Sequence, residues 1–456
     1  MKVFLRTYGC QMNKLDSSLV VNSFMQAGFE LTEQVGETDV VLINTCSVRN
    51  HAEERVISLL GHLKHIKKTK PEIIVAVFGC MAQRLKDDLL SHDAVNIVCG
   101  PLQIPELVNL VNNAVGRVKK QSDVSGDIRR KPSQGQLQDL DDFEYSYDSA
   151  ENHLPAQAYV RVMHGCDKFC SYCVVPYVRG PEVSRAPEKI IAQIKKLADA
   201  GVKQITLLGQ TVNSYRYNSF SFAELLCEVS KNNGIEWIKF VTCYPKDFDE
   251  RIFKAMADLP KVCRYLHIPA QSGSGKILKA MNRQYTCAEY LDLLQKARQI
   301  VPDIAIAGDF IVGFPGETEE DFQKSVELVQ KAQYKNCFIF KYSPRPGTRA
   351  DEKKADDVPM EVKKQRNMKL LAVQEEISRN FNKSFIGRAV KVLVEGVSKK
   401  AHLDKADKEE HPQLIGRTSI DYIVVFNGPQ SLAGRFADVR ITRTSALTLF
   451  GELAAS

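Results

Sequence analysis

Short apolar runs alternate with amphipathic helical patterns at the start of the chain. Each apolar run is followed by a stretch of helical period, and the runs cover residues 2–9, 39–45, 72–79 and 95–100. Such alternation is typical of parallel strands joined by crossover helices. We therefore predict that residues 1–118 form an N-terminal domain with an open parallel α/β sheet.

A polar segment interrupts this alternation before it resumes. Residues 119–153 contain Gly, Pro and Ser without a hydrophobic period, so we predict a linker there. Six further apolar runs, each with its helical segment, cover residues 158–165, 204–210, 237–244, 264–271, 304–313 and 337–344. They predict a partial TIM-type (β/α)6 barrel over residues 154–383, closed by a long helix at residues 360–383. Chemistry in such barrels lies at the carboxyl ends of the strands.

The pattern changes again in residues 384–451. Short β patterns lie among glycines and charges, at residues 389–396, 421–426, 435–442 and 446–453. They predict a small antiparallel β-barrel of the OB-like sort, a fold that often binds RNA. A structural or oligomerising β domain explains the same pattern nearly as well.

Composition indicates a globular protein of about three domains, since the chain has 456 residues, 44% of them hydrophobic and 26% charged. Arg6 follows only three apolar residues, and no uncharged run approaches the ~18 residues of a membrane span. We therefore expect a cytoplasmic protein without membrane contact. The formal net charge of +7 is compatible with a polyanionic partner but small for this length.

Twelve cysteines are many for a reducing compartment, where metal binding, catalysis or burial explains them better than disulfides. Cys166, Cys170 and Cys173 follow the first predicted barrel strand with a Cys-x3-Cys-x2-Cys spacing. A zinc site fits poorly, because structural zinc prefers a closed tetrahedral site with four protein ligands and the sequence contains no second Cys-x2-Cys pair. A four-iron cluster held by three thiolates would keep one iron open for a small molecule.

Three other cysteines occupy equivalent places in the N-terminal domain. Cys10, Cys46 and Cys80 each lie just past the carboxyl end of a predicted strand. That edge is where open α/β sheets bind ligands, so we expect the three thiols within reach of one cluster. Cys99 ends the fourth predicted strand and could complete a closed four-thiolate site suited to electron transfer; without it, one iron would again stay open.

The motif at Cys166, with Tyr172 before its last cysteine, resembles the signature of radical S-adenosylmethionine (SAM) enzymes. Other motifs follow the order seen in the methylthiotransferases of that superfamily: TYGCQMN, INTCSVR, VFGCMAQ, HGCDKFCSYCVVPYVRGPEVSR, LLGQTVNSY, QSGSGKILKAMNRQYT, DFIVGFPGETEEDF and YSPRPGT. The terminal β module is similar to a TRAM domain in VLVEGVSKK, LIGRTSIDYIVVF and GRFADVRIT. The resemblance thus covers nearly the whole chain.

The resemblance implies two [4Fe–4S] clusters and SAM as cofactors, with sulfide or polysulfide carried on the auxiliary cluster. The ligands it implies are Cys166, Cys170 and Cys173 for the SAM-binding cluster and Cys10, Cys46 and Cys80 for the auxiliary one. Cys99 has no counterpart in the family pattern, so we interpret it as a packing cysteine.

Candidate SAM contacts lie at the ends of barrel strands, and they are Tyr172, Gly209, Gln210, Gln271 and Asp309. A strand-end glycine can equally make a turn, and a buried Gln or Asp can equally cap a helix. Arg179 and Arg185 follow the cluster loop and suit either phosphate contact or a local salt bridge.

Within the family, TYGCQMN and CVVPYVRGPEVSR look most like the MiaB branch, which converts N6-isopentenyladenosine at position 37 of tRNA into its 2-methylthio form. That implies one SAM as methyl donor and another as the source of a 5′-deoxyadenosyl radical. The partners implied are the tRNA anticodon loop, an electron donor such as flavodoxin, and an iron–sulfur or sulfur carrier; we expect a monomer. The sequence departs from the branch pattern in the substrate pocket, at Ala270, Thr211, Cys243 and Tyr244.

Three alternatives stay open. One is the same chemistry on a different substrate, either t6A of tRNA or an aspartate of a ribosomal protein. A second is a non-catalytic iron–sulfur protein that binds RNA. The third is an RNA-binding module stabilised by zinc.

Overall fold

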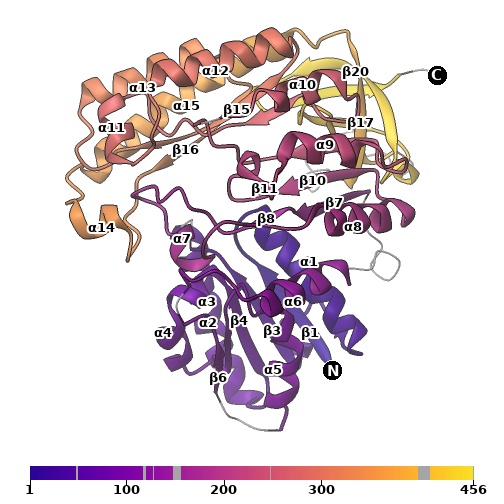
Figure 1. Cartoon of the computed structure of the whole chain (residues 1–456). Coiled ribbons are helices and arrows are strands. Elements are labelled where there is room, and N and C mark those ends of the chain that lie inside the picture. Colours follow the sequence, from indigo (N-terminus) through magenta and orange to yellow (C-terminus); the bar gives the residue numbers. More distant parts are fainter. Residues whose placement is uncertain are drawn as a thin grey trace.

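The computed structural model describes residues 1–47, 50–116, 120–126, 128–146, 156–246, 248–398 and 411–454. A sheet domain formed by the N-terminal part packs beneath a barrel, and a small β-barrel lies at the far end of that barrel (Figure 1). Among the helices in these ranges, none is long and apolar enough to cross a membrane.

The N-terminal domain is built on a six-stranded parallel sheet. Its strands are β1 (Lys2–Thr7), β2 (Glu30–Leu31), β3 (Val40–Thr45), β4 (Ile74–Gly79), β5 (Ile97–Cys99) and β6 (Gln121–Asp123), in the order β2-β1-β3-β4-β5-β6. Helices α1 (Gln11–Gln26) and α5 (Leu107–Ala114) cover one face. Helices α2 (Asn50–Thr69) and α4 (Lys86–Ser91) cover the other face. Because both faces are covered, the central strands β3 and β4 are buried throughout, and the expected open parallel sheet is confirmed.

The segment predicted to be a linker contains two regular elements. Strand β6 adds to the edge of the sheet, and helix α6 (Gln134–Tyr145) packs with Leu140 buried. The linker prediction is therefore wrong for these residues. Ser133 and Gln136 form a capping box, a helix-start signal present in the sequence that the polar composition outweighed. Residues 147–153 of that segment lie outside the described part of the chain.

Six parallel strands form the central barrel. They are β7 (Gln157–Arg161), β10 (Gln204–Leu208), β13 (Trp237–Phe240), β14 (Tyr265–His267), β15 (Ala305–Val312) and β16 (Asn336–Lys341). The ladder runs β7-β10-β13 and β14-β15-β16, and a bridge between Ile238 and Val262 joins the two halves. No described pairing joins β16 back to β7, so the expected partial barrel is confirmed.

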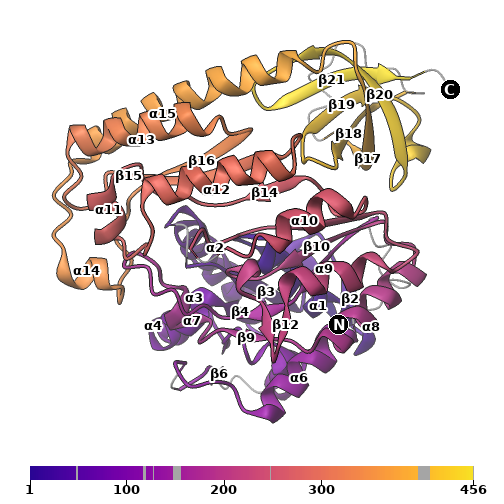
Figure 2. The same cartoon turned by 45° about the horizontal axis from the view of Figure 1, so that its top comes forward.

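Helices cover the outside of this barrel. In chain order the longer ones are α8 (Pro187–Asp199), α9 (Phe222–Ser230), α10 (Arg251–Asp258), α12 (Cys287–Ile300), α13 (Glu319–Ala332) and α15 (Met360–Lys383). Helix α15 has the bounds expected from the sequence, and it leads from the barrel to the C-terminal β-barrel (Figure 2). At its end the Asn382 side-chain amide donates to the carbonyl oxygens of Ser445 (2.8 Å) and Ala446 (3.1 Å).

The C-terminal module is a closed five-stranded barrel. Its strands are β17 (Ala389–Val397), β18 (Gln413–Thr418), β19 (Ile423–Asn427), β20 (Phe436–Thr444) and β21 (Thr448–Leu453), in the order β17-β18-β19-β21-β20. The sequence pattern missed β18, whose central Gly416 weakens a strand signal. The β19–β21 pair is parallel and the others are antiparallel, since a ring with an odd number of strands cannot alternate throughout.

Buried ion pairs join the sheet domain to the barrel. Asp16 of α1 is 1% exposed; it pairs with Arg161 of β7, and its Oδ2 accepts from Nη2 of Arg179 at 2.9 Å. The Arg185 Nε donates to Asp141 of α6 at 2.6 Å. Arg179 and Arg185 are therefore engaged in the salt bridges that the sequence offered as the alternative to phosphate contact.

Candidate functional site

The first cysteine triplet lies at one edge of the N-terminal sheet. Cys10, Cys46 and Cys80 follow the adjacent strands β1, β3 and β4. A Cβ built on Gly9 would lie 2.7 Å from that of Cys46, and one built on Gly79 would lie 2.7 Å from the carbonyl oxygen before Cys46. Both glycines also have positive φ, +128° and +97°. These two motif glycines thus let the three cysteine loops touch.

Two buried asparagines connect the loops further. The Asn13 amide Nδ2 donates to Oδ1 of Asn44 at 2.7 Å, and Asn44 Nδ2 donates to the Asn13 carbonyl oxygen at 2.8 Å. Asn13 Oδ1 accepts from both the backbone N–H and the thiol of Cys10, each at 3.4 Å. The roles of these asparagines were not predicted from the sequence, although both residues lie inside the quoted motifs. They orient the Cys10 loop against the Cys46 loop.

Gly79→Ala is expected to destabilise the protein by about 1–3 kcal/mol, because the new Cβ meets a backbone oxygen at a positive φ. Gly61→Ala is the matched control: Gly61 lies inside α2 with open space around it, and alanine there should stabilise by about 0.5–1 kcal/mol. Thermal unfolding of both variants measures the difference. Equal melting temperatures would contradict the tight packing of the loops.

The second triplet lies in the loop after β8 (Met163–His164), at the carboxyl end of the first barrel strand. Cys166 and Cys170 are buried, and burial raises the pKa of the Cys166 thiol to about 11. The Arg283 Nη1 donates to Sγ of Cys170 at 3.4 Å. Sequence reasoning missed Arg283, although the motif QSGSGKILKAMNRQYT contains it. Arg283 therefore places a positive charge beside the Cys170 sulfur.

A second arginine reaches the first triplet from the barrel side. Burial raises the pKa of the Cys80 thiol, and Arg179, whose Nε donates to the Cys80 sulfur at 3.2 Å, opposes this effect. Cys80 also packs against Val174 and Val178. Helix α3 (Cys80–Arg84) therefore lies beside α7 (Val175–Val178), which follows the second triplet (Figure 1). The two cysteine loops are neighbours although they belong to different domains.

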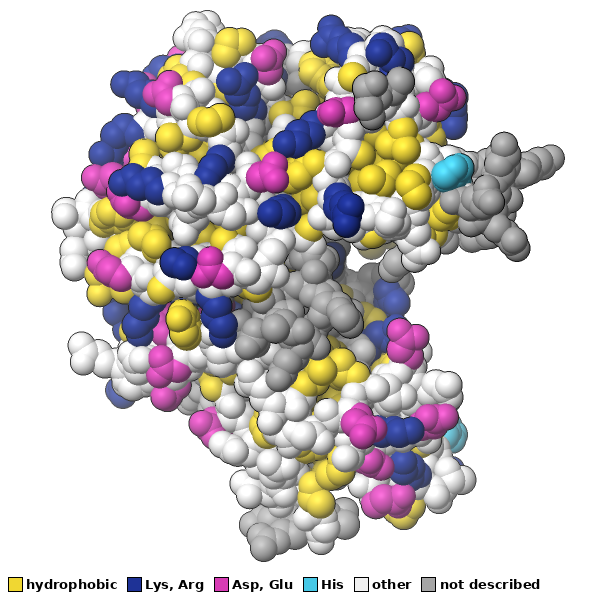
Figure 3. Space-filling model, turned by 90° about the vertical axis from the view of Figure 1, so that its right-hand side faces the viewer, with side chains coloured by type: hydrophobic (Ala, Val, Ile, Leu, Met, Phe, Trp, Pro, Cys, Tyr) yellow, Lys and Arg dark blue, Asp and Glu magenta, His cyan; other side chains and the backbone are white. Residues whose placement is uncertain are grey.

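One cavity of about 1820 Å³ is lined by residues of all three domains. Cys10 and Cys46 line it from the sheet domain, Cys173 from the barrel, and Arg417 and Asp421 from the C-terminal module. The surface is indented between the N-terminal domain below and the C-terminal barrel above (Figure 3). In the described ranges, no three His, Cys, Asp or Glu side chains lie close enough to share a single metal ion.

The structure separates the candidate SAM contacts into two groups. Tyr172, Gln271 and Asp309 line the cavity. Gly209 and Gln210 are not among the described residues that line it. A Cβ on Gly209 would lie 2.6 Å from Cγ of Met163, so close packing explains that glycine.

Gln271 has an unsatisfied acceptor in this cavity. Its backbone is held in an unusual conformation, with φ +72°, by two bonds to β15: its N–H donates to the Asp309 carbonyl (2.7 Å), and its carbonyl accepts from Ile311 (3.0 Å). The buried side-chain Oε1 has no hydrogen-bond partner within the described structure. Nearby, His267 Nε2 and Asp309 Oδ1 are 2.9 Å apart. These groups suit a polar ligand at the strand ends.

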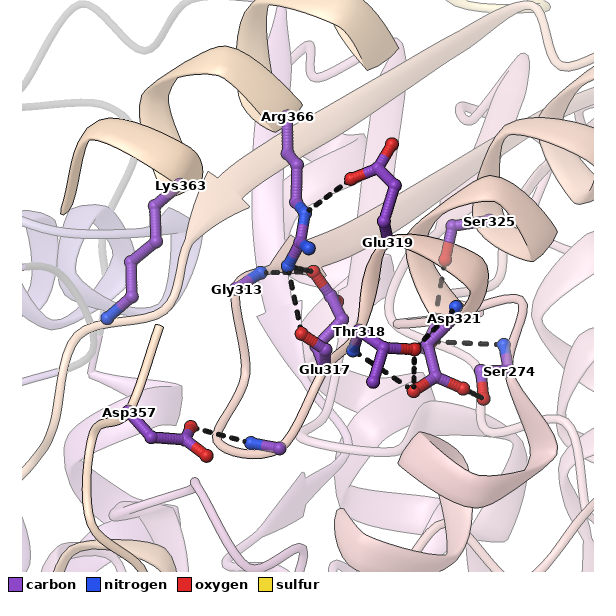
Figure 4. Close-up of polar contacts among 12 residues, drawn as sticks. Ser274, Gly313, Glu317, Thr318, Glu319, Asp321, Ser325, Asp357, Lys363 and Arg366 are labelled. Carbon is purple, nitrogen blue, oxygen red and sulfur yellow. Dashed lines mark hydrogen bonds and ion pairs between the residues drawn. The ribbon is translucent and has the colours of Figure 1, made fainter. Parts of the chain in front are cut away.

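A polar network holds the loop after β15 at the rim of the barrel (Figure 4). The Glu317 Oε1 accepts from the Gly313 N–H at 2.8 Å and from Nη1 of Arg366, on α15, at 2.9 Å. Ser274 Oγ donates to Oδ1 of Asp321, on α13, at 2.6 Å. The start of α15 is thus fixed to the rim and its end to the C-terminal barrel, so α15 sets the position of that module.

Between pH 5 and pH 8 the wild type is expected to lose about 1–3 kcal/mol more of its unfolding free energy than the Glu317→Gln variant. Burial raises the pKa of Glu317 from 4.5 to about 7, although Gly313 and Arg366 favour its charged form. A carboxyl with a raised pKa contributes stability that is fully present below the unfolded pKa and lost as pH rises through about 7.

Unfolding midpoints at both pH values test this. The control is Glu319→Gln, since Glu319 contacts Arg366 at 3.4 Å but its side chain is 68% exposed. Parallel pH profiles for the wild type and Glu317→Gln would contradict the raised pKa.

Three family models match the chain: the radical SAM superfamily over residues 160–329, the uncharacterized protein family UPF0004 over residues 2–100, and the TRAM domain over residues 383–454. Among solved structures, the radical SAM methyltransferase TsrM from Kitasatospora setae, with cobalamin and a [4Fe-4S] cluster bound, has a TM-score of 0.54. It is 14% identical and the match covers 77% of this chain and 73% of that chain, a likeness that shows the fold alone.

Curated proteins match over almost their whole length. A protein named tRNA-2-methylthio-N(6)-dimethylallyladenosine synthase from Rhodopirellula baltica is 45% identical, over 99% of this chain and 95% of that protein. A protein of the same name from Acetivibrio thermocellus is 41% identical, over 98% of this chain and 90% of that protein. The resemblance inferred from the motifs is confirmed, and the chain belongs to the tRNA-2-methylthio-N(6)-dimethylallyladenosine synthase family of radical SAM proteins.

Proposed function

We propose that this protein is a radical SAM methylthiotransferase that adds a methylthio group to C2 of N6-isopentenyladenosine at position 37 of tRNA. The observation that carries the proposal is the shared cavity, which Cys10 and Cys46 line from one triplet and Cys173 from the other. A base that reacts at a ring carbon must leave its stack and enter such a space.

The barrel residues fit a SAM-binding cluster. Cys166, Cys170 and Cys173 would hold a [4Fe–4S] cluster, and Arg283 already donates to the Cys170 sulfur. When bound, the cluster and SAM supply a 5′-deoxyadenosyl radical that abstracts hydrogen from the substrate.

Tyr172, Gln271 and Asp309 are the proposed SAM contacts, because they line the same cavity. The unpaired Gln271 Oε1 can accept a hydrogen bond from the ligand. Tyr172 packs against the apolar cluster that contains Phe314, a residue of the loop that Glu317 and Arg366 hold.

We assign the first triplet to an auxiliary [4Fe–4S] cluster that carries sulfide or polysulfide. Cys10, Cys46 and Cys80 would be its ligands, with Arg179 as donor to the Cys80 sulfur. Cys99 fits the packing role, since it is fully buried among apolar residues of the sheet core such as Ile97 and Leu107. Three thiolates then leave one iron for the sulfur to be transferred.

The proposed partners follow from this chemistry. The anticodon loop of tRNA is the substrate, and the C-terminal barrel contributes Arg417 and Asp421 to the wall of the reaction cavity. An electron donor such as flavodoxin would reduce the clusters, and an iron–sulfur or sulfur carrier would replace the consumed sulfur. We propose that the protein acts as a cytoplasmic monomer.

The test is to incubate reconstituted protein anaerobically with SAM, dithionite and isopentenylated tRNA, and to look for the methylthio nucleoside by mass spectrometry. Parallel reactions with t6A-containing tRNA and with ribosomal proteins separate the alternative substrates. Absence of 5′-deoxyadenosine would support a non-catalytic iron–sulfur protein. About one zinc per site and no iron, by elemental analysis, would support a zinc-stabilised module.

A further inference from the structure

The last barrel strand presents two aromatic rings to the cavity. Phe338 and Phe340 of β16 are 47% and 39% exposed, and both line the cavity. Residues two apart on a strand point to the same face, so the rings lie side by side. Exposed phenylalanines are costly in water, and a pair inside a cavity indicates a surface for an apolar or planar ligand.

The residues around these rings indicate which chemical class of ligand fits the cavity. Phe338 meets His267 edge to face, with ring centroids 6.1 Å apart, and His267 is oriented by Asp309 at 2.9 Å. The apolar side chains of Val241 and Ile311 line the same cavity. The wall therefore combines flat rings, an oriented imidazole and aliphatic groups, which suits a purine that carries an apolar substituent.

We propose that Phe338 and Phe340 form the platform on which the extruded adenine stacks, with its apolar N6 substituent against the aliphatic wall. This inference rests on the proposed function and deepens it by assigning residues that determine specificity. Aromatic rings replace the stacking that a base loses when it leaves an RNA loop. Such stacking has a free energy of about 1–3 kcal/mol per base by alanine substitution, which corresponds to about a 5- to 150-fold change in affinity.

The proposed placement also favours the isopentenyl group over a polar N6 substituent. A polar N6 substituent, such as the one in t6A, would lose hydrogen bonds to water against Val241 and Ile311. An apolar substituent gains from the same burial. The cavity would thus bind both modified adenines by stacking on the base and discriminate between them by the polarity of the N6 substituent.

The experiment measures binding of an anticodon stem-loop RNA, with either isopentenyladenosine or adenosine at position 37, by fluorescence anisotropy on reconstituted full-length protein. Wild type should prefer the isopentenylated RNA. Phe338→Ala and Phe340→Ala should each weaken its binding about 5-fold or more. Phe338→Trp should restore most of the affinity, whereas Phe338→Leu, which is apolar but has no flat ring, should not.

The matched control is Tyr217→Ala, since Tyr217 is 37% exposed on the β11–β12 hairpin, Arg216–Tyr217 and Phe220–Ser221, and is not among the described cavity residues. Its RNA affinity should equal that of wild type. If wild type prefers isopentenylated RNA while Phe338→Ala and Phe340→Ala bind like wild type, the platform is overturned and the proposed function stands. If wild type binds neither RNA, the proposed function itself fails.

Discussion

Replacing Cys166, Cys170 and Cys173 together with alanine is expected to abolish reductive cleavage of SAM and to lower iron from about eight to about four atoms per chain. The three thiols lie in one loop at the end of the first barrel strand, and Cys173 lines the shared cavity. Without them that loop lacks the three proposed ligands of the SAM-binding cluster. Iron analysis of reconstituted protein and detection of 5′-deoxyadenosine after addition of dithionite measure both effects.

The matched control is alanine at Cys227, Cys263 and Cys287, which removes three thiols outside both triplets. That variant should retain about eight irons and full SAM cleavage. Eight irons persisting after replacement of the barrel triplet would refute the ligand assignment. Loss of all iron would show instead that the two clusters depend on one another for assembly.

Asp16→Asn is expected to lower the free energy of unfolding by about 3–5 kcal/mol. Asp16 is 1% exposed and is the carboxylate shared by Arg161 and Arg179, whose side chains are also buried. The neutral amide removes the carboxylate that pairs with Arg179 and leaves Arg161 with Glu144, at 3.3 Å, as its remaining buried partner. Arg179 also donates to the Cys80 sulfur, so the proposed auxiliary site should loosen at the same time.

Urea unfolding and iron retention test this prediction. Asp199→Asn is the control, because the pair of Asp199 with Lys195 has side chains 67% and 69% exposed, and exposed pairs contribute only about 0–1 kcal/mol. Equal unfolding midpoints for the two variants would show that the buried group does not hold the domains together.

Local sequence patterns predicted most of the architecture. An apolar run followed by a helical period is a local signal of a few residues, and it identified β1, β3, β4, β5 and the six barrel strands. The same reasoning missed β2, β6 and β18, because β2 has only two residues, β6 has no apolar residue and β18 contains a glycine. It also missed α6, because the polar composition of this segment favoured a linker over the helix start at Ser133.

The residues of the candidate site, too, were only partly predictable from the sequence. Cys-x3-Cys-x2-Cys is a spacing within one loop, and sequence alone was sufficient to recognise it. The positions of Cys10, Cys46 and Cys80 after strands followed from predicted topology. Arg283 and Asn13 were not found, because an arginine or an asparagine has no signal until its partner in space is known.

By itself, then, the sequence determined the fold class, the two cysteine triplets and the family, since these depend on periodicity, spacing and motif order. Only the tertiary structure decided which residues share a cavity and which arginines serve as interdomain ion pairs. Cys46, Cys173 and Arg417 come from three domains, and their meeting depends on how those domains pack. The physical reason is that side-chain burial and charge pairing across domains are set by contacts between residues more than a hundred positions apart, as for Asp16 and Arg179.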